Sequence, residues 1–244
     1  MVRNAEAQNI GIGRQTTFAE NREKRVRFAV DVASDESIPS ILARAAELHC
    51  LFHLNPIMAA VGLNRSRPGG TQLLAPSKID ELAWVLRIDP NLLKERVGYR
   101  ISAHSYQFDA FVIPAMTLDL RERWISPKSL LQKPYHRFAW LNRHLPYCPE
   151  SGELLTNICD RCHKTLGWNY SWGLAKCEHC ESVVSPNTNP QLPEELAPQY
   201  RFFSELWSTD LIARNAALAK LPKAICAVDL TILISVALKM SALI

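Results

Sequence analysis

The chain has 244 residues, 48% of them apolar, and its 28 lysine and arginine side chains against 24 acidic ones give a net charge of +4. This composition excludes a disordered tail and a fibrous repeat, and it permits nucleic acid as a partner without requiring it. The longest apolar run, 230–244, is shorter than the roughly 18 to 20 residues of a membrane span and contains Lys239, so no membrane partner is expected. The first residues lack the apolar segment of a signal peptide, which favours a cytoplasmic protein.

Shifts in composition divide the chain into four expected parts. These are a flexible basic lead-in at 1–34, an α-helical N-terminal domain at 35–115, a basic and aromatic segment followed by paired cysteines at 116–190, and a C-terminal helical segment at 191–244. In the last part, two helices are expected at about 198–218 and 224–244.

Short helices are expected throughout the N-terminal domain. Ser37 is a candidate N-cap, and the apolar stripe behind it predicts a helix that reaches His49. A second short helix should end at Gly62, because glycine tolerates the positive φ that closes a helix. Two more are expected at 77–86 and 91–97. Short helices a few residues apart are typical of a helix-turn-helix, although any small α bundle gives the same pattern.

Residues 121–143 concentrate positive charge around a single acid, Glu122. The basic side chains of this segment are Arg121, Arg123, Lys128, Lys133, Arg137 and Arg143. Four aromatic residues are interleaved with them, and such a mixture can neutralise phosphates and stack on bases. These six residues are therefore candidate nucleic-acid contacts. A solvated face whose aromatic side chains turn into the core explains the same residues.

Two C-x-x-C pairs give the strongest chemical signal. Cys159 and Cys162 form the first pair and Cys177 and Cys180 the second, with fourteen residues between the pairs. The spacing is near that of a zinc ribbon, and four thiolates suit one tetrahedral Zn²⁺ ion with no open position. A structural zinc contributes about 10 to 16 kcal/mol of folding free energy, which a segment with so small a core needs. Alternating large side chains at 166–172 favour a strand of the ribbon hairpin.

Other chemistries of these cysteines fit the sequence less well. The C-x-x-C-H at 159–163 is also the attachment motif of c-type haem, but that interpretation requires export and leaves the second pair unexplained. A thioredoxin-like pair would need a surrounding βαβ pattern. His163 and His179 are expected to lie beside the metal without binding it. Cys148 is expected to be a structural or vestigial thiol, and Cys50 a small apolar residue.

The predicted fold class follows from these elements. It is mainly α, with an N-terminal helix-turn-helix-like bundle, a small β element that carries the four-cysteine zinc ribbon, and C-terminal helices. No catalytic residue is predicted, since four thiolate ligands leave no coordination position for water, and the chain is not expected to be an enzyme.

Three motifs, in this order, resemble the TniQ family of transposition target-selection proteins. Family members open with an E-S-x-x-S-x-L-x-R helix, matched here by Glu36, Ser37, Ser40, Leu42 and Arg44. A C-P-x-H-G-x-x-L element follows in the family, matched here by Cys148, Pro149, Gly152 and Leu155. A C-P-x-C and a final C-x-x-C complete the family pattern, and the two cysteine pairs of this chain stand in those places.

The chain also departs from the family pattern. Family members often carry an earlier C-x-x-C that completes a first zinc site, but here no C-x-x-C precedes Cys148, and Ser151 stands where the histidine of that site would be. One zinc ion is therefore expected instead of two.

The resemblance implies a DNA-binding adaptor that selects target DNA or bridges it to the transposition machinery. The partners it implies are DNA, transposition proteins such as a transposase or its ATPase regulator and, in some systems, an RNA-guided complex; a homodimer is a further candidate. An alternative is a zinc-ribbon module that binds only proteins and has no direct contact with DNA.

Overall fold

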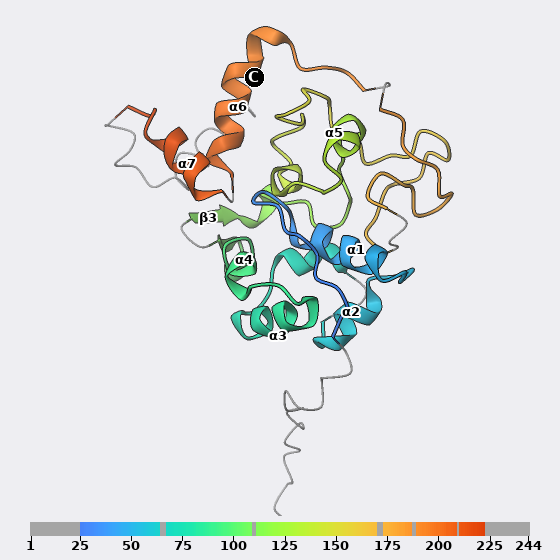
Figure 1. Cartoon of the computed structure of the whole chain (residues 1–244). Coiled ribbons are helices and arrows are strands. Elements are labelled where there is room, and N and C mark those ends of the chain that lie inside the picture. The colour runs from blue at the N-terminus through green and yellow to red at the C-terminus, as the bar shows by residue number, and fades with distance from the viewer. Residues whose placement is uncertain are drawn as a thin grey trace, which may run out of the picture.

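A computed structural model describes residues 25–63, 67–108, 111–169, 173–186, 189–208 and 210–222. These residues form a helix-rich protein with a small three-stranded antiparallel sheet (Figure 1). The helices are α1 (Ile38–Leu48), α2 (Asn55–Ala60), α3 (Pro76–Leu86), α4 (Pro90–Lys94), α5 (Pro127–Gln132), α6 (Ala197–Leu206) and α7 (Leu211–Leu218). Short 3-10 turns lie at η2 (Pro68–Gln72), η3 (Ala115–Thr117), η4 (Phe138–Leu141) and η5 (Glu194–Leu196).

The first helix begins where the sequence predicts. Ser37 is its N-cap, and the Ser37 hydroxyl accepts a hydrogen bond from the backbone N–H of Ser40 at 3.4 Å. Ile38, Ile41 and Leu42 of α1 are fully buried. The buried apolar side chains of the described residues form one cluster around this helix, so the segments that composition separates share a common core.

The next three helices are close to their predicted positions. The chain leaves α2 through Gly62, whose φ of +67° is the positive value expected there. Helix α3 runs almost as predicted and packs against α4. Helix α4 ends at Lys94, three residues early, because Val97 turns into the core and the chain enters a strand at Gly98. A helix-turn-helix arrangement of these helices stays a prediction.

A three-stranded sheet lies within the domain that was predicted as α-helical at 35–115, so this part of the chain contains strands as well as helices. Strands β1 (Gly98–Ser102), β2 (Ser105–Phe108) and β3 (Phe111–Pro114) pair antiparallel in the order β1-β2-β3. A Cβ on Gly98 would come within 2.4 Å of the Phe108 ring, so glycine allows this ring to lie across β1. Phe108 is fully buried and meets Phe138 edge to face, which joins the sheet to the core.

Residues 25–34 also depart from their prediction, since they pack against the helices instead of forming part of a flexible lead-in. The backbone N–H of Val26 donates to the carbonyl of Val85 at 2.9 Å, and Val26 and Val30 are buried. Arg25 lies over the Trp84 ring at 5.2 Å. The two valines pack on the apolar core. The basic composition of the segment gave no indication of these contacts. Residues 1–24 lie outside the described part of the chain.

Two helices replace the single helix predicted at 198–218. Helix α6 ends at Leu206 with the buried Trp207 as its C-cap, and α7 starts after a new N-cap, Asp210. The Asp210 carboxylate accepts hydrogen bonds from the backbone N–H groups of Ile212 at 2.9 Å and Ala213 at 3.3 Å. The helix predicted at 224–244 lies outside the described residues. Among the helices that the structure describes, none combines the length and the apolarity of a membrane span.

Candidate metal centre

The four predicted cysteine ligands lie together at one point. All four sulfur atoms lie within 4.8 Å of one another, and the Sγ–Sγ distance is 3.6 Å for Cys159 and Cys180 and again for Cys162 and Cys177. Four sulfurs bound to one ion at about 2.3 Å in a tetrahedron lie about 3.8 Å apart. The cluster therefore has the dimensions of a tetrathiolate site and can hold a metal ion.

Each cysteine pair sits on a tight turn with the same backbone hydrogen bonds. In the first turn, the N–H of Cys159 donates to the carbonyl of Lys164 at 3.0 Å, and the N–H of His163 donates back to the carbonyl of Cys159 at 2.9 Å. The second turn repeats this pattern between Cys177 and Ser182. The residue after the second cysteine has a positive φ in both turns, +56° at His163 and +59° at the equivalent position. We call such a turn a knuckle.

The surroundings of the sulfurs differ within the cluster. Burial raises the pKa of Cys159 to about 12, so this thiol needs a nearby positive charge before it becomes a thiolate. Hydrogen bonds from the hydroxyl and the backbone N–H of Ser182 lower the pKa of Cys180 to about 6. The thiolate is the form that binds a metal, and a divalent ion supplies the charge that a buried thiolate requires.

The turn at Cys148 is a third knuckle that lacks the second cysteine. The N–H of Cys148 donates to the carbonyl of Glu153 at 2.8 Å, the N–H of Gly152 donates to the carbonyl of Cys148 at 2.9 Å, and Gly152 has a φ of +68°. Ser151 occupies the position of the missing cysteine, and its hydroxyl lies 2.9 Å from that of Ser126. Hydrogen bonds hold this knuckle, in which Cys148 is fully buried.

Glu178, between the cysteines of the second metal knuckle, fixes the loop at 167–169. Its carboxylate accepts a hydrogen bond from the backbone N–H of Asn169 at 3.1 Å. The same carboxylate lies so close to Gly167 that an added Cβ would come within 2.4 Å of Oε1. His179 lies on the rim, where its Nε2 is 3.2 Å from the carbonyl of Thr165.

The strand predicted at 166–172 is absent from its described part, 166–169. The β structure near the cysteines consists of single bridges, Ile158–Thr165 in the first knuckle and Lys176–Val183 in the second. Trp168 is 2% exposed. The backbone N–H of Asn169 donates to the Glu178 carboxylate, so it is not available to a neighbouring strand, and the segment forms a loop.

The predicted phosphate contact Arg123 is buried and faces the cysteine element, as we call the segments 158–169 and 173–183 that carry the two metal knuckles. Its guanidinium donates to the carbonyl of Lys176 at 2.6 Å and lies 5.9 Å from the centre of the Trp168 ring. Its backbone N–H donates to the carbonyl of Leu166 at 2.9 Å. Burial lowers the pKa of Arg123 to about 10 against the opposing charge of Glu178. Arg123 therefore fastens the basic segment to the cysteine element and is not presented to a phosphate.

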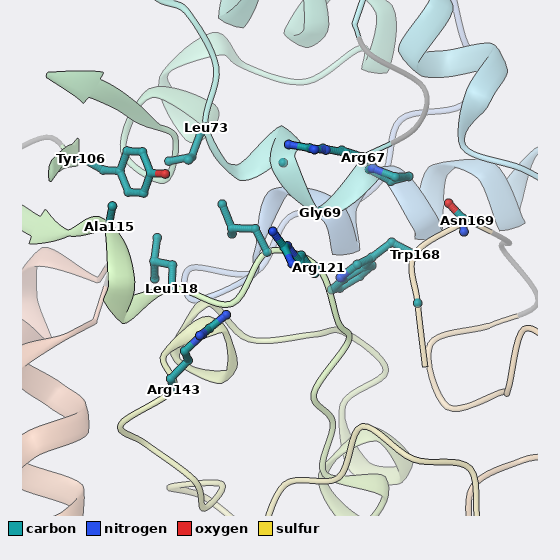
Figure 2. Close-up of a pocket in the computed structure, with 14 residues that line it drawn as sticks. Arg67, Gly69, Leu73, Tyr106, Ala115, Leu118, Arg121, Arg143, Trp168 and Asn169 are labelled. Atoms are coloured by element: carbon teal, nitrogen blue, oxygen red, sulfur yellow. The ribbon is translucent and has the colours of Figure 1, made fainter. Parts of the chain in front are cut away.

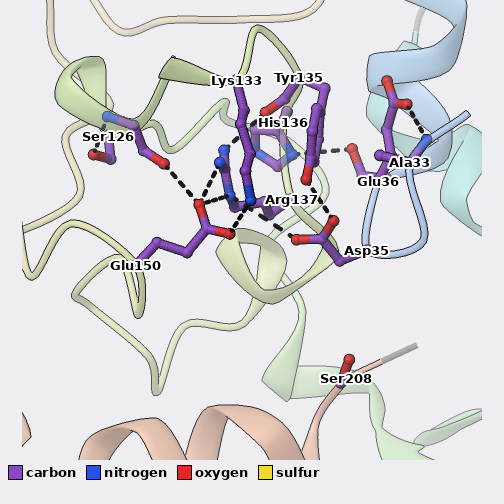
Figure 3. Close-up of polar contacts among 12 residues, drawn as sticks. Ala33, Asp35, Glu36, Ser126, Lys133, Tyr135, His136, Arg137, Glu150 and Ser208 are labelled. Atoms are coloured by element: carbon purple, nitrogen blue, oxygen red, sulfur yellow. Dashed lines mark hydrogen bonds and ion pairs between the residues drawn. The ribbon is translucent and has the colours of Figure 1, made fainter. Parts of the chain in front are cut away.

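Arg137 is the second predicted phosphate contact that the structure buries. Its Nε and Nη2 atoms donate to Oε2 of Glu150 at 3.0 and 2.5 Å (Figure 3). The guanidinium lies 4.8 Å from the ring centres of both Tyr135 and Trp140. Burial acts to raise the pKa of Glu150, but the charges and hydrogen bonds of Arg137 and Lys133 together outweigh burial and hold this pKa below its usual value. Arg137 is thus satisfied inside the protein.

The remaining four predicted phosphate contacts are exposed. They are Arg121, Lys128, Lys133 and Arg143. Lys133 forms an ion pair with Glu150 at 3.1 Å, and Arg143 forms one with Asp119 at 3.5 Å. The side chains of Arg121 and Lys128 form no ion pair with a described residue. Of the six predicted contacts, these two are the most available to an external anion.

The E-S-x-x-S-x-L-x-R motif forms a buried polar network. The Glu36 carboxylate accepts hydrogen bonds from the Ser40 hydroxyl at 2.7 Å and from Arg44 at 2.8 Å, and burial raises its pKa. The network continues to the buried His136, whose Nδ1 lies 3.0 Å from the Ser37 hydroxyl and whose backbone N–H donates to the Ser40 hydroxyl. The glutamate, serines and arginine of the motif are therefore explained by the packing of α1 against the segment around His136.

Three contributors to the site were not predicted: His136, Glu150 and Glu178. His136 and Glu150 are distant in sequence from the groups that they contact, and only Glu178, placed between two of the cysteines, carried a local signal.

No protein-family model matches the chain, and no curated protein matches its sequence.

Proposed function

We propose that the protein is a zinc-containing DNA-binding adaptor, of the kind that its resemblance to the TniQ family implies. It would select target DNA or bridge it to transposition proteins, with a binding role and no catalysis of its own. The observation that supports this proposal most directly is the attachment of the basic segment to the cysteine element through Arg123. Arg121, two residues earlier, is exposed and has no ion-pair partner among the described residues.

Zinc is the proposed occupant of the cysteine cluster. Four soft thiolate donors at tetrahedral distances suit Zn²⁺, and four protein ligands leave no position for a substrate or a water molecule. When bound, the ion supplies the charge that keeps the buried sulfurs as thiolates. Cys159, Cys162, Cys177 and Cys180 would hold the ion, and the two knuckles would keep Lys176 and Leu166 in position for Arg123.

The exposed cations would bind the phosphate backbone of DNA. Phosphate contacts position a protein on DNA, whereas contacts with base edges select a sequence. The proposed phosphate contacts are Arg121, Lys128, Lys133 and Arg143. The helices α1 to α4 would be the readers of a DNA groove, in the manner of the predicted helix-turn-helix.

A protein-only interaction module is the second candidate, and the C-terminal helices favour it. Ile212 on α7 is 83% exposed, Phe203 on α6 is 49% exposed, and Leu196 just before α6 is 51% exposed. Large apolar side chains gathered on consecutive elements are typical of a surface that binds another protein. This surface is compatible with an adaptor that also binds DNA.

Binding to duplex DNA at several salt concentrations tests the proposed function. Each phosphate neutralised on B-DNA contributes about −0.9 to the log–log slope of affinity against salt, so four contacts predict a slope of about −3.6 between roughly 50 and 200 mM salt. Replacement of both unpaired cations, Arg121→Ala with Lys128→Ala, should reduce this slope by about 2. The measurement is fluorescence anisotropy of a labelled duplex with the zinc-loaded full chain.

The matched control is Arg201→Ala, which removes an exposed arginine of α6 outside the basic segment. It should leave both the affinity and the slope close to those of the unaltered protein. If the unaltered protein binds no nucleic acid, or binds it with no salt dependence, the protein-only module replaces the DNA-binding adaptor.

A further inference from the structure

A cleft of about 590 Å³ opens beside the cysteine element. Four stretches of chain that are distant in sequence form its walls: 67–73 with η2, Tyr106 of β2, 115–121, and the loop at 167–169 (Figure 2). Arg143 completes the lining. The volume falls in the range of about 300 to 1,000 Å³ that is usual for small-ligand sites.

The cleft is strongly cationic. Arg67, Arg121 and Arg143 enter it from three separate segments, and none of the described residues that line it is acidic. Arg67 and Arg121 form no ion pair with a described residue, whereas Asp119 partly neutralises Arg143 at 3.5 Å. Guanidinium groups offer planar, forked donors that match phosphate oxygens, so the cleft is suited to a phosphate.

The other part of the lining is apolar and aromatic. In Figure 2, Tyr106, Leu73 and Leu118 lie at one end of the cleft and Arg67 at the other, with Arg121 between them. Tyr106 is partly exposed, so its ring is accessible from the cleft. A ligand that fills this cleft should therefore combine an anionic group with a flat, weakly polar one. A nucleotide has both parts, a phosphate and a base.

The walls of the cleft are held in place before any ligand arrives. A Cβ on Gly69 would come within 2.2 Å of the carbonyl oxygen of Leu120 and 3.1 Å of the Trp168 ring, so three of the walls meet at this glycine. Trp168 is 2% exposed and packs edge to face on His136 with ring centres 4.8 Å apart. Glu178 holds the neighbouring loop by its hydrogen bond to Asn169.

We infer that this cleft binds an unpaired segment of a DNA strand. An unpaired nucleotide presents its phosphate and the face of its base together, which matches the arginines and the Tyr106 end of the cleft. A duplex keeps its bases stacked inside and would offer only its backbone to a concave surface. The inference rests on the proposed DNA-binding function and adds that target DNA is held where its strands are separated.

The test compares a short labelled oligothymidine strand with a duplex of the same length by fluorescence anisotropy, using the zinc-loaded full chain. Arg67→Glu reverses a charge in the cleft but lies outside the basic segment at 121–143, and Arg67 is exposed, so the variant should fold. It should weaken binding of the single strand about tenfold or more and change duplex binding far less. Tyr106→Leu should weaken only the single strand, through loss of base stacking.

Two control variants separate this inference from the proposed function. Lys128→Glu alters an exposed cation that does not line the cleft, so it should weaken the duplex and the single strand to a similar extent. Arg201→Glu should affect neither. If the unaltered protein binds the duplex but not the single strand, or if Arg67→Glu binds the single strand as tightly as the unaltered protein, the inference fails and the proposed function stands. If neither form of DNA binds, both fail.

Discussion

Burial decides the role of several charged residues more than their type does. Arg123 and Arg137 belong to the same basic run as Arg121 and Lys128, yet each is only 2% exposed and donates its side-chain hydrogen bonds inside the protein. The sequence distinguishes these two pairs poorly, because all four residues lie among aromatic and polar neighbours. Long-range partners make the difference, and they cannot be read from local spacing.

His136 should make stability depend on pH in weakly acidic solution. It is fully buried next to Arg123, and burial lowers its pKa to about 3 from the usual 6.5. Below about pH 6.5 this histidine becomes protonated in the unfolded chain but stays neutral in the folded chain. The stabilisation is therefore complete above about pH 6.5 and is lost as the pH falls. Between about pH 7 and 5.5 the free energy of unfolding should fall by about 1 kcal/mol.

Urea unfolding of the zinc-saturated protein at both pH values measures this loss. His136→Gln, which does not titrate, should be less stable at neutral pH but should show a pH dependence smaller by about the same 1 kcal/mol. An equal pH dependence in the variant and the unaltered protein would assign the effect to another group.

At the scale of elements, local signals predict helices well and the sheet poorly. Ser37, Gly62 and the apolar stripe of α3 mark their helices because caps and periodicity act within a few residues. Strands β1 to β3 are short, and β1 is exposed at every residue after Gly98. Only the pairing of the strands with one another and the packing of Phe108 on the core select them. Such pairing is not visible in the periodicity of any single segment.

The cysteine element was partly predictable for the same reason. The two C-x-x-C pairs identify the four sulfurs that lie together, but the loop between them depends on contacts made by Trp168 and Glu178. The third knuckle has no cysteine at the position of Ser151, so no C-x-x-C spacing in the sequence indicates it. Only the repeated hydrogen bonds of the backbone reveal that it has the same shape.

Two neighbouring glycines of η2 should respond differently to an added methyl group. A Cβ on Gly69 would come within 2.2 Å of the Leu120 carbonyl oxygen, whereas a Cβ on Gly70 would meet only the Cβ of Arg67 at 3.7 Å. Gly69→Ala should therefore lower the free energy of unfolding by about 1 to 3 kcal/mol, as overpacking does. Gly70→Ala should change it by less than about 1 kcal/mol. Urea denaturation compares the two, and equal effects would show that the contact at Gly69 relaxes freely.

At the scale of the whole molecule, metal removal should loosen one region selectively. Cys159→Ser should abolish binding of the zinc ion proposed for the cluster, measured as metal per chain by elemental analysis, because one of the four buried or half-buried sulfurs is gone. Cys50→Ser is the matched control: Cys50 is exposed and outside the cluster, so zinc should be retained. Hydrogen exchange should show faster exchange of the Asn169 N–H in the first variant only. Full zinc content in Cys159→Ser would falsify the ligand assignment.

The knuckle at Cys148 is held by hydrogen bonds, so its structure does not depend on a bound metal ion. Its neighbour Tyr147 is joined to α6 by Tyr200, whose hydroxyl donates to the Tyr147 carbonyl at 2.7 Å and accepts from the Tyr147 N–H at 2.8 Å. Loss of the zinc proposed for the cysteine cluster would thus loosen the 167–169 wall of the arginine-lined cleft first, while Tyr200 would still hold α6 to the chain beside Cys148. The proposed contact with a protein partner would then outlast the proposed binding of a DNA strand when zinc is scarce.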